Sequence, residues 1–269
     1  MIVYFVVSSK GYLKNYEPKI PILASFYYLR ESNIAYFRSK ASSFFLDSGA
    51  YSAFTRNEKI DIDKYAQFIH NNIGEFDIYA NLDAIGDWKA SETNQKYLES
   101  CGLKPIPVYH YNEPLEVLKR MLSEYEYIGI GGSTQLDTKG CFNFFNECFE
   151  LICNEDGTPK NRIHGFGLTK LKIMRHYPFY SVDSTAPLLQ AAMGTLYDYE
   201  GHNLSLSRDK KIDTQTKIYL EKYYPAFDIE KLKNDYITRF LANIQFYNWV
   251  SEGLTKNPPR YFHRQNRLF

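Results

Sequence analysis

The chain has 269 residues, and its 32 Lys and Arg against 31 Asp and Glu give a formal net charge of +1. This length allows one large α/β barrel or two small domains. Because 44% of the residues are hydrophobic, an intrinsically disordered chain is excluded. The balanced charge excludes a globally basic nucleic-acid coat but leaves room for a local basic patch.

The longest early apolar run, residues 2–7, is too short for a secretory signal, and no stretch approaches the length of a membrane span, so we expect neither. Its cysteines form no CxxC pair, so we expect neither a zinc knuckle nor a disulfide scaffold. They are Cys101, Cys141, Cys148 and Cys153. We therefore expect no metal, no cofactor, no membrane partner and a reducing, cytoplasmic location.

Short β-forming runs alternate with stretches of helical periodicity along the chain. The predicted strands are 2–8, 44–47, 76–83, 105–110, 127–131, 162–167 and 179–183, with an eighth placed within 195–207. The predicted helices are 61–72, 90–100, 114–123, one near 141–153, and one in the segment between the first two strands. From about residue 209 long amphipathic helices follow, of which 228–251 is the clearest.

This order predicts parallel βαβ units, and the absence of a glycine-rich dinucleotide fingerprint favours a closed barrel over a doubly wound sheet. The predicted fold class is α/β, a (β/α)8 TIM-like barrel with extra C-terminal helices. We expect residues 1–269 to form a single barrel domain, with 209–269 as a helical extension packed on it.

Polar residues and glycines end the predicted strands, and the active sites of such barrels lie at these strand ends. They are Asp47, Asp83, His110, Gly131 and Gly132, Gly165 to Gly167, and Asp183. An Asp after a strand is often only a helix cap or a turn former, a glycine pair a tight turn, and a lone His a structural residue. Three carboxylates at one face of a barrel favour a functional site, because burying each one is costly without a partner.

The segments around these residues resemble those of the tRNA-guanine transglycosylases, in family order. Asp47-Ser48-Gly49-Ala50-Tyr51 is similar to the family's Asp-Ser-Gly-Gly-Phe segment, and Asp83 falls at its base-recognition aspartate. Ile128 to Gly132 is similar to its Gly-Gly-Leu strand end, and His164 to Thr169 to its Met-Gly-Val-Gly-Thr corner. Asp183 falls at its nucleophilic aspartate, so the resemblance covers about residues 44–185.

The chain also departs from that family. It has no cysteine-rich zinc site, His110 stands where a Gln is expected, and the chain is shorter than typical members. These departures resemble the reduced phage and bacterial relatives, some of which place 7-deazaguanines in DNA. A phage-encoded member would act in the host cytoplasm.

The resemblance implies exchange of guanine in DNA or tRNA for a 7-deazaguanine through a covalent aspartyl-sugar intermediate. Asp183 would be the nucleophile and Asp47 the general acid and base, while Asp83 would bind the base. The remaining substrate-binding residues implied are Ser48, Gly49, Tyr51, His110, Gly131, Gly132, Phe166 and Gly167. Tyr51 and Phe166 would stack on the base.

The implied partners are a nucleic acid and the free 7-deazaguanine base, with a homodimer as a further possibility. Cations near the C-terminus either bind phosphates or form a solvated tail. They are Arg260, His263, Arg264 and Arg267, and the same ambiguity holds for Arg208, Lys210 and Lys211.

Three alternatives stay open. One is a metal-dependent barrel hydrolase, with Asp47, Asp83, His110 and Asp183 as ligands. Another is a barrel that binds nucleic acid without catalysis. The third is a glycoside hydrolase, in which water replaces the base as acceptor.

Overall fold

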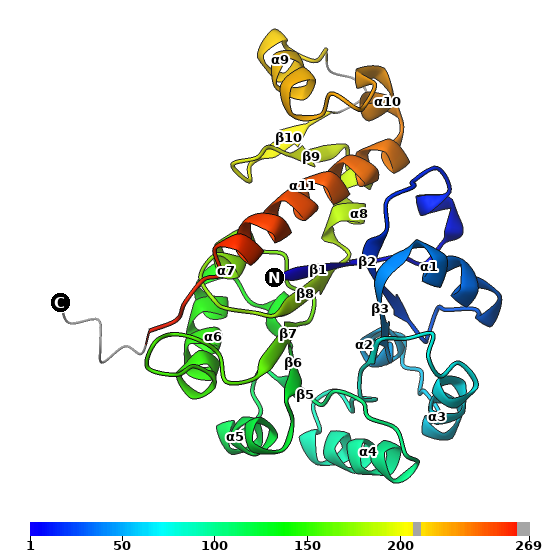
Figure 1. Cartoon of the computed structure of the whole chain (residues 1–269), viewed down its shortest axis with the longest axis vertical. Helices are drawn as coiled ribbons and strands as arrows, with labels where there is room; N and C mark the ends of the chain where they lie inside the picture. The colour runs from blue at the N-terminus through cyan, green and yellow to red at the C-terminus, as the bar shows by residue number, and fades with distance from the viewer. Residues whose placement is uncertain (207–210, 263–269) are drawn as a thin grey trace.

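The structure is a computed structural model that describes residues 1–206 and 211–262. Within these residues eight parallel strands form one curled sheet surrounded by helices, a (β/α)8 TIM-like fold (Figure 1). The strands are β1 (Ile2–Val6), β2 (Ile20–Ser25), β3 (Ala41–Asp47), β4 (Ile78–Tyr79), β5 (Val108–His110), β6 (Tyr127–Gly131), β7 (Arg162–Gly165) and β8 (Ser181–Ser184). The predicted fold class is confirmed.

The sheet closes where its two outer strands meet. The strand order is β4-β3-β2-β1-β8-β7-β6-β5, and a parallel bridge between Ala80 and Ile106 joins the ends. The amide of Ile106 donates to the carbonyl of Tyr79, and the amide of Asn81 to the carbonyl of Ile106, both at 2.9 Å. Closure removes the unpaired edges that an open sheet exposes.

The strands bury side chains on both faces, as parallel strands do. Along β1, Val3 and Phe5 belong to the cluster shared with the helices. Tyr4 alternates with them and packs with Leu23 and Phe45 in a cluster built from strand and strand-end residues. That second cluster therefore fills the inside of the barrel.

Helices connect most of the strands. They are α1 (Ile34–Lys40), α2 (Ala50–Thr55), α3 (Ile62–Asn71), α4 (Trp88–Ser100), α5 (Leu115–Glu124), α6 (Thr138–Ile152), α7 (Leu171–Met174) and α8 (Ala186–Ala192). Only a 3₁₀ turn, Lys10–Leu13, lies between β1 and β2. The predicted helices at 61–72, 90–100, 114–123 and 141–153 correspond to α3, α4, α5 and α6.

One expectation about the strands is wrong. The eighth barrel strand is β2, which lies between β1 and the helix predicted in that segment, α1, rather than within 195–207. Pro21 in this run argues against a central strand, yet Ile20–Ser25 pairs with both β1 and β3. Residues 195–205 instead form a separate antiparallel hairpin, β9 (Thr195–Tyr197) and β10 (Asn203–Ser205).

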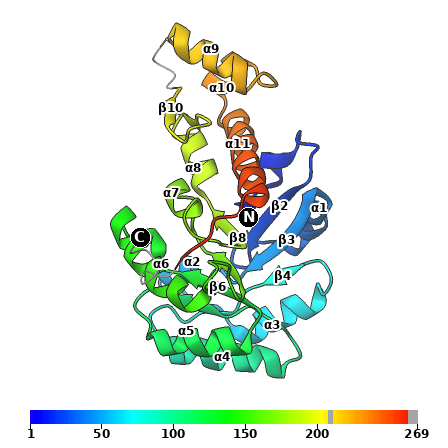
Figure 2. The same cartoon turned by 60° about the vertical axis from the view of Figure 1, so that its left-hand side comes forward.

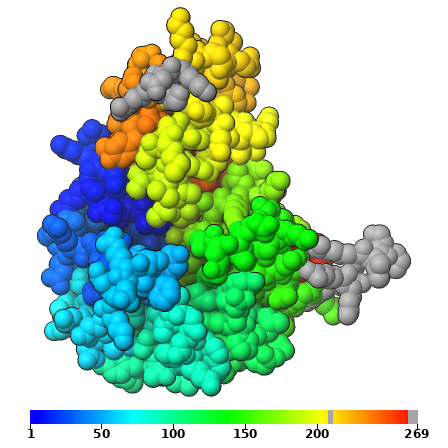
Figure 3. Space-filling view, turned by 180° about the vertical axis from the view of Figure 1, so that it is seen from behind, coloured from blue at the N-terminus to red at the C-terminus, as the bar shows by residue number. Residues whose placement is uncertain are grey.

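The C-terminal segment projects outward from the barrel (Figures 2 and 3). Besides the hairpin it holds α9 (Thr214–Tyr223), α10 (Ile229–Asn234) and α11 (Tyr236–Lys256), with a hydrophobic cluster of its own. The single helix predicted over 228–251 is two helices, because Asp235 caps a new one by accepting from Ile237 and Thr238.

Helix α11 ties this segment back to the barrel. Asn243 donates to the carbonyl of Pro187 in α8, and Arg239 donates to that of Ala191. Near the other end of α11, Ser251 donates to the carbonyl of Met1, beside β1. No helix in the described ranges is both long and apolar enough to cross a membrane.

Replacing Gly49 by Ala is expected to destabilise the fold by about 2–5 kcal/mol. Gly49 has a φ of +80°, and an added Cβ would lie 2.4 Å from Oγ of Ser25 and 2.5 Å from Cβ of Tyr27. Gly102 is a matched control, since its φ is +79° but an added Cβ meets nothing within 4 Å. Gly102→Ala should lose only about 1–2 kcal/mol. Urea unfolding of both variants measures the difference, and equal losses would contradict the packing around Gly49.

Candidate functional site

Three aspartates at the carboxyl ends of strands stand apart from the other aspartates of the chain. Six others accept hydrogen bonds from the first turn of a helix: Asp61, Asp87, Asp137, Asp213, Asp228 and Asp235. Asp47 ends β3, Asp83 follows β4, and Asp183 lies in β8. None of these three is the N-cap of a described helix, so the helix-cap interpretation fails for them.

Asp47 is a carboxyl group with a strongly raised pKa. Burial raises it most, the nearby charges of Asp183 and Asp83 raise it further, and the resulting pKa is about 7. The amide of Gly49, which donates to Oδ2 at 3.0 Å, and the hydroxyl of Ser25 act in the opposite direction. Asp47 can therefore take up or release a proton near neutral pH.

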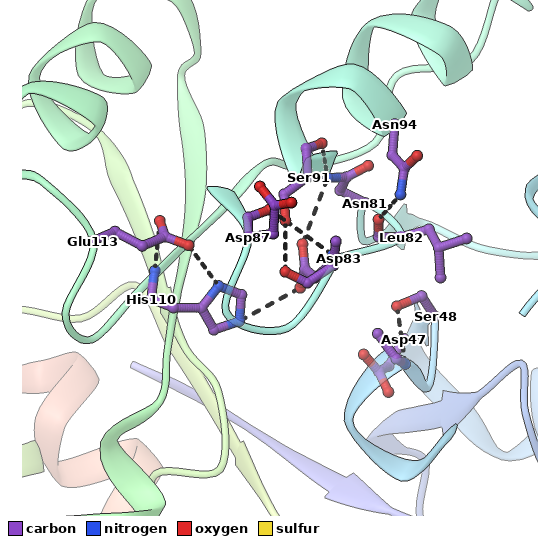
Figure 4. A network of polar contacts seen from close by, with 12 residues as sticks. Asp47, Ser48, Asn81, Leu82, Asp83, Asp87, Ser91, Asn94, His110 and Glu113 are labelled. Atoms are coloured by element: carbon purple, nitrogen blue, oxygen red, sulfur yellow. Dashed lines mark hydrogen bonds and ion pairs between the residues drawn. The ribbon is translucent and has the colours of Figure 1, made fainter. Parts of the chain in front are cut away.

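Asp83 forms a second acid–base group with His110 and Glu113 (Figure 4). The imidazole of His110 lies between the two carboxyls, with Nε2 at 3.6 Å from Oδ2 of Asp83 and Nδ1 at 3.5 Å from Oε1 of Glu113. The side chains of Asp83 and Glu113 are only 10% and 8% exposed. Glu113 is fixed further because Oε2 accepts from the amide of His110 at 3.1 Å.

The pKa values of Asp83 and His110 are both raised. Burial raises the pKa of Asp83 to about 7, although His110 and Asn81 oppose the rise and Glu113 adds to it. Burial alone would lower the pKa of His110, but Asp83 and Glu113 outweigh it and leave the pKa raised. Asp83 and His110 therefore form a pair of neighbouring acid–base groups, and the Asp83 carboxyl has its pKa near neutral pH.

Asp183 has two nitrogen partners. Its Oδ1 lies 3.1 Å from Nε2 of His164 and accepts from the amide of Gly167 at 3.0 Å. The residue is only 7% exposed. Its charge raises the pKa of Asp47, so the carboxyl groups of β3 and β8 lie near one another at the mouth of the barrel.

The predicted glycines have packing roles in the structure. An added Cβ at Gly131 would lie 2.7 Å from the His110 ring, so the absent side chain makes room for that imidazole. Gly132 has a φ of +80°, where an added Cβ would lie 3.0 Å from Tyr111. Gly167, at +65°, would meet Thr134 at 2.5 Å. These roles account for the glycines without a ligand.

The other predicted substrate-binding residues differ in how far they are exposed to solvent. Ser48 is buried, and its hydroxyl accepts from the amide of Ala50. Tyr51 is 63% exposed on α2. The ring of Phe166 packs against His164, with centroids 4.4 Å apart, and against Phe45 inside the barrel. A stacking role for Tyr51 or Phe166 stays a prediction.

Three neighbours of the aspartates were missed in the sequence. Ser25 was overlooked because its strand, β2, was not predicted. Glu113 lies three residues after His110, a spacing that could have indicated the pair. His164 lies within β7 and was not included among the predicted site residues, and its Nε2 lies 3.1 Å from Oδ1 of Asp183.

The hydrolase alternative required a metal site at the mouth. Among residues 1–206 and 211–262, the one group of three side chains close enough to hold a metal ion is Asp198, Glu200 and His202, at the β9–β10 turn. The mouth residues Asp47, Asp83, His110 and Asp183 form no such group, so they do not support that alternative.

Most of the predicted phosphate-binding cations lie outside the described residues. These are Arg208, Lys210, His263, Arg264 and Arg267. Lys211 and Arg260 are exposed. Neither a nucleic-acid partner nor a homodimer is tested by the structure.

Comparison with known proteins gives likeness of fold only. No protein-family model and no curated protein matches the chain. A solved mutant tryptophan synthase α-subunit from Pyrococcus furiosus is 11% identical with a TM-score of 0.45, over 72% of this chain and 90% of that one. The N-terminal domain of a proposed aldolase from Bacteroides vulgatus is 11% identical with a TM-score of 0.45, over 97% and 89%. A protein from Aquifex aeolicus VF5 is 12% identical with a TM-score of 0.43, over 70% and 84%.

These findings correct the prediction of a tRNA-guanine transglycosylase. The similar structures are of a tryptophan synthase α-subunit and a proposed aldolase, which point away from that family. The implied glycosyltransferase activity and the exchange of guanine for a 7-deazaguanine are withdrawn with it. The short motifs that suggested the family have local structural causes, as Gly49 and Gly131 show. Since the likeness is too low to transfer an activity, the function must be argued from the site.

The two raised pKa values make the stability of the fold depend on pH. Asp47 and Asp83 have a pKa of about 7 in the fold against 3.8 as the ordinary value. Between about pH 4 and 7 the folded chain binds more protons than the unfolded one, so the free energy of unfolding falls as pH rises, by at most about 1.4 kcal/mol per pH unit for each carboxyl. Asp47→Asn and Asp83→Asn should each flatten this fall in urea unfolding at a series of pH values.

Asp61→Asn is the control, because asparagine also caps helices and the residue lies on the exposed start of α3. It should leave the pH dependence unchanged. A wild-type profile without a decline between pH 4 and 7, or the same profile in all three variants, would contradict the raised pKa values.

Proposed function

We propose that this chain is an enzyme that transfers protons on a small uncharged carbonyl compound, through an enolate or enol. The observation that carries the proposal is the pair of carboxyl groups, Asp47 and Asp83, whose pKa values are both about 7 at one mouth. General acid–base catalysis is most effective when the pKa of the catalytic group lies near the working pH.

Asp47 is suited to act as the base. Its ionised form removes a proton from the carbon next to the carbonyl, and the electron pair of that C–H bond forms a C=C bond. The electron pair of the C=O bond moves to oxygen. Because Asp183 and burial both raise the pKa of Asp47, this carboxylate is a stronger base than an exposed aspartate.

Asp83 and His110 are suited to supply the proton that the oxygen takes up. Nε2 of His110 lies 3.6 Å from Oδ2 of Asp83, and Glu113 faces Nδ1 of the same imidazole at 3.5 Å. Return of a proton from Asp47 to the same carbon restores the substrate, and it gives exchange when Asp47 has traded its proton with the solvent. In a 2-hydroxycarbonyl compound, delivery of the proton to the former carbonyl carbon gives isomerisation, because the hydroxyl group of the other carbon then loses its proton to the Asp83–His110 pair and becomes the new carbonyl. Isomerases and lyases that form an enolate share this first step.

The charge of the mouth favours an uncharged substrate. Within the described residues Asp47, Asp83 and Asp183 form no ion pair with Lys or Arg, and only histidines pair with the latter two. Lys170, in the segment after β7, is already bonded to the carbonyl of Leu136. An anionic substrate would meet these carboxyl groups without a compensating cation.

Proton exchange in D2O tests this proposal directly. The probes are hydroxyacetone, dihydroxyacetone and glyceraldehyde, with pyruvate as an anionic comparison. The protein is expected to accelerate the loss of the C–H proton signal in at least one of the uncharged compounds and not in pyruvate. Asp47→Asn and Asp83→Asn should slow that exchange by about 10²-fold or more.

Asp61→Asn again serves as the control, since it keeps a helix cap away from the mouth. It should exchange at the wild-type rate. Exchange no faster than in buffer for all three uncharged compounds, or full activity in both mouth variants, would rule the proposal out.

A further inference from the structure

A chain of four polar side chains runs through the inside of the barrel to Asp183. The hydroxyl groups of Tyr127 and Ser181 are 2.6 Å apart, and Oγ of Ser181 is 2.7 Å from Nδ1 of His164. Nε2 of His164 is 3.1 Å from Oδ1 of Asp183. The chain joins β6, β7 and β8, and its last member is a mouth carboxyl.

The imidazole in this chain is enclosed by aromatic rings. His164 is 0% exposed. The ring centroids of Phe166 and Phe45 lie 4.4 and 4.8 Å from its own, and that of Tyr4 lies 6.0 Å away. The partners of its two ring nitrogens are therefore the members of the chain, Ser181 and Asp183.

The hydrogen bonds allow one consistent direction for a neutral imidazole. If Nδ1 carried the proton, the bare Nε2 would face a carboxylate oxygen, and two acceptors would meet at 3.1 Å. With the proton on Nε2, the ring donates to Asp183 and accepts from Ser181 at Nδ1. Ser181 in turn accepts from Tyr127, so every member of the chain is satisfied.

A backbone donor holds the same carboxylate oxygen. The amide of Gly167 donates to Oδ1 of Asp183 at 3.0 Å, from a turn with a φ of +65° that favours glycine. With two donors on Oδ1, the orientation of the carboxylate is fixed. The described residues provide no hydrogen bond to Oδ2, so the carboxylate is held through Oδ1.

We propose that His164 is a positioning residue for Asp183: the buried Tyr127–Ser181 pair fixes its imidazole as the Nε2–H tautomer, which holds Oδ1 and so keeps the carboxylate in place beside Asp47. The inference deepens the proposed function and rests on it, since a fixed carboxylate beside Asp47 matters only if proton transfer occurs there. Its structural half, the tautomer, can be tested without any substrate.

The tautomer is measured by 15N NMR of the imidazoles at pH 7.5. The chain has 6 His, and the signal of His164 is the one lost in His164→Gln. We expect Nε2 to show the shift of a protonated nitrogen and Nδ1 that of an unprotonated one that accepts a hydrogen bond. In Ser181→Ala the Nδ1 signal should move, because its donor is gone.

The positioning is measured by the D2O exchange of the uncharged carbonyl compounds. Ser181→Ala should lower kcat about tenfold to a hundredfold while KM stays within twofold, because only the alignment of Asp183 is disturbed. His164→Leu should do the same, and His164→Gln, which keeps an N–H donor, should recover most of the rate.

Ser43→Ala is the matched control. Ser43 forms the same kind of pair with a tyrosine of the barrel, its Oγ lying 2.8 Å from the hydroxyl of Tyr4, but it has no bond to His164. It should leave kcat unchanged while losing a similar amount of stability to Ser181→Ala in urea unfolding.

Each outcome separates the positioning role from the function on which it rests. An Nδ1–H tautomer, or an imidazole protonated on both nitrogens, would overturn the inference and leave the acid–base proposal intact. Equal losses of kcat in Ser181→Ala and Ser43→Ala would overturn the positioning role as well. If the wild-type protein shows no exchange, the proposed function fails, and the inference falls with it even where the NMR spectrum shows the Nε2–H tautomer.

Discussion

The structure depends on how three carboxyl groups share one poorly solvated mouth without a lysine or arginine that pairs with them in the described chain. Like charges at close range in a low-dielectric site cannot all be ionised without a large energetic penalty. The fold meets this constraint in a different way for each group. Asp183 receives two N–H donors, Asp83 receives an imidazole, and Asp47 receives one amide and remains the group most affected by its neighbours. Crowding of the carboxyl groups lowers stability, and it also gives Asp47 and Asp83 pKa values at which they exchange protons near neutral pH.

The two imidazoles that contact these carboxyl groups come from different strands, so the closure of the barrel determines which carboxyl each imidazole reaches. His164 is on β7 and reaches Asp183 on the adjacent β8, while His110 ends β5 and reaches Asp83 across the seam where β4 and β5 meet. Closure of the sheet at Ala80 and Ile106 is thus also what brings the second acid–base group together. An open sheet with the same sequence would leave Asp83 without its imidazole. The environment that sets the pKa values of Asp83 and His110 therefore depends on closure of the barrel.

The sequence was sufficient for the fold class and for the three aspartates, because each follows a β-forming run and parallel strands end at a common face. It was insufficient for β2, since Pro21 argues against an interior strand and no regular helix separates β1 from β2.

The family resemblance failed for a physical reason. Gly49 adopts a left-handed turn, and Gly131 leaves room for the ring of His110, so short glycine motifs at strand ends arise from packing in a barrel as well as from shared chemistry. The role of His164 could not be seen either, because its partners Ser181 and Asp183 lie 17 and 19 residues away along the chain.

The inside of the barrel shows where stability and function are in conflict. Barrels of this type are usually filled by branched aliphatic side chains, whereas this one places His164, Ser181 and Tyr127 among aromatic rings. A polar chain in such a place contributes little to stability even when every group is satisfied, and apolar residues of similar volume often serve as well or better. The position of the polar chain explains its presence better than its contribution to stability does. The chain ends at Asp183, whereas the neighbouring Tyr4–Ser43 pair is bonded to no mouth carboxyl. Every group in this network has a hydrogen-bond partner, and the network ends on one oxygen of Asp183. A network of this kind can hold that oxygen in a fixed position.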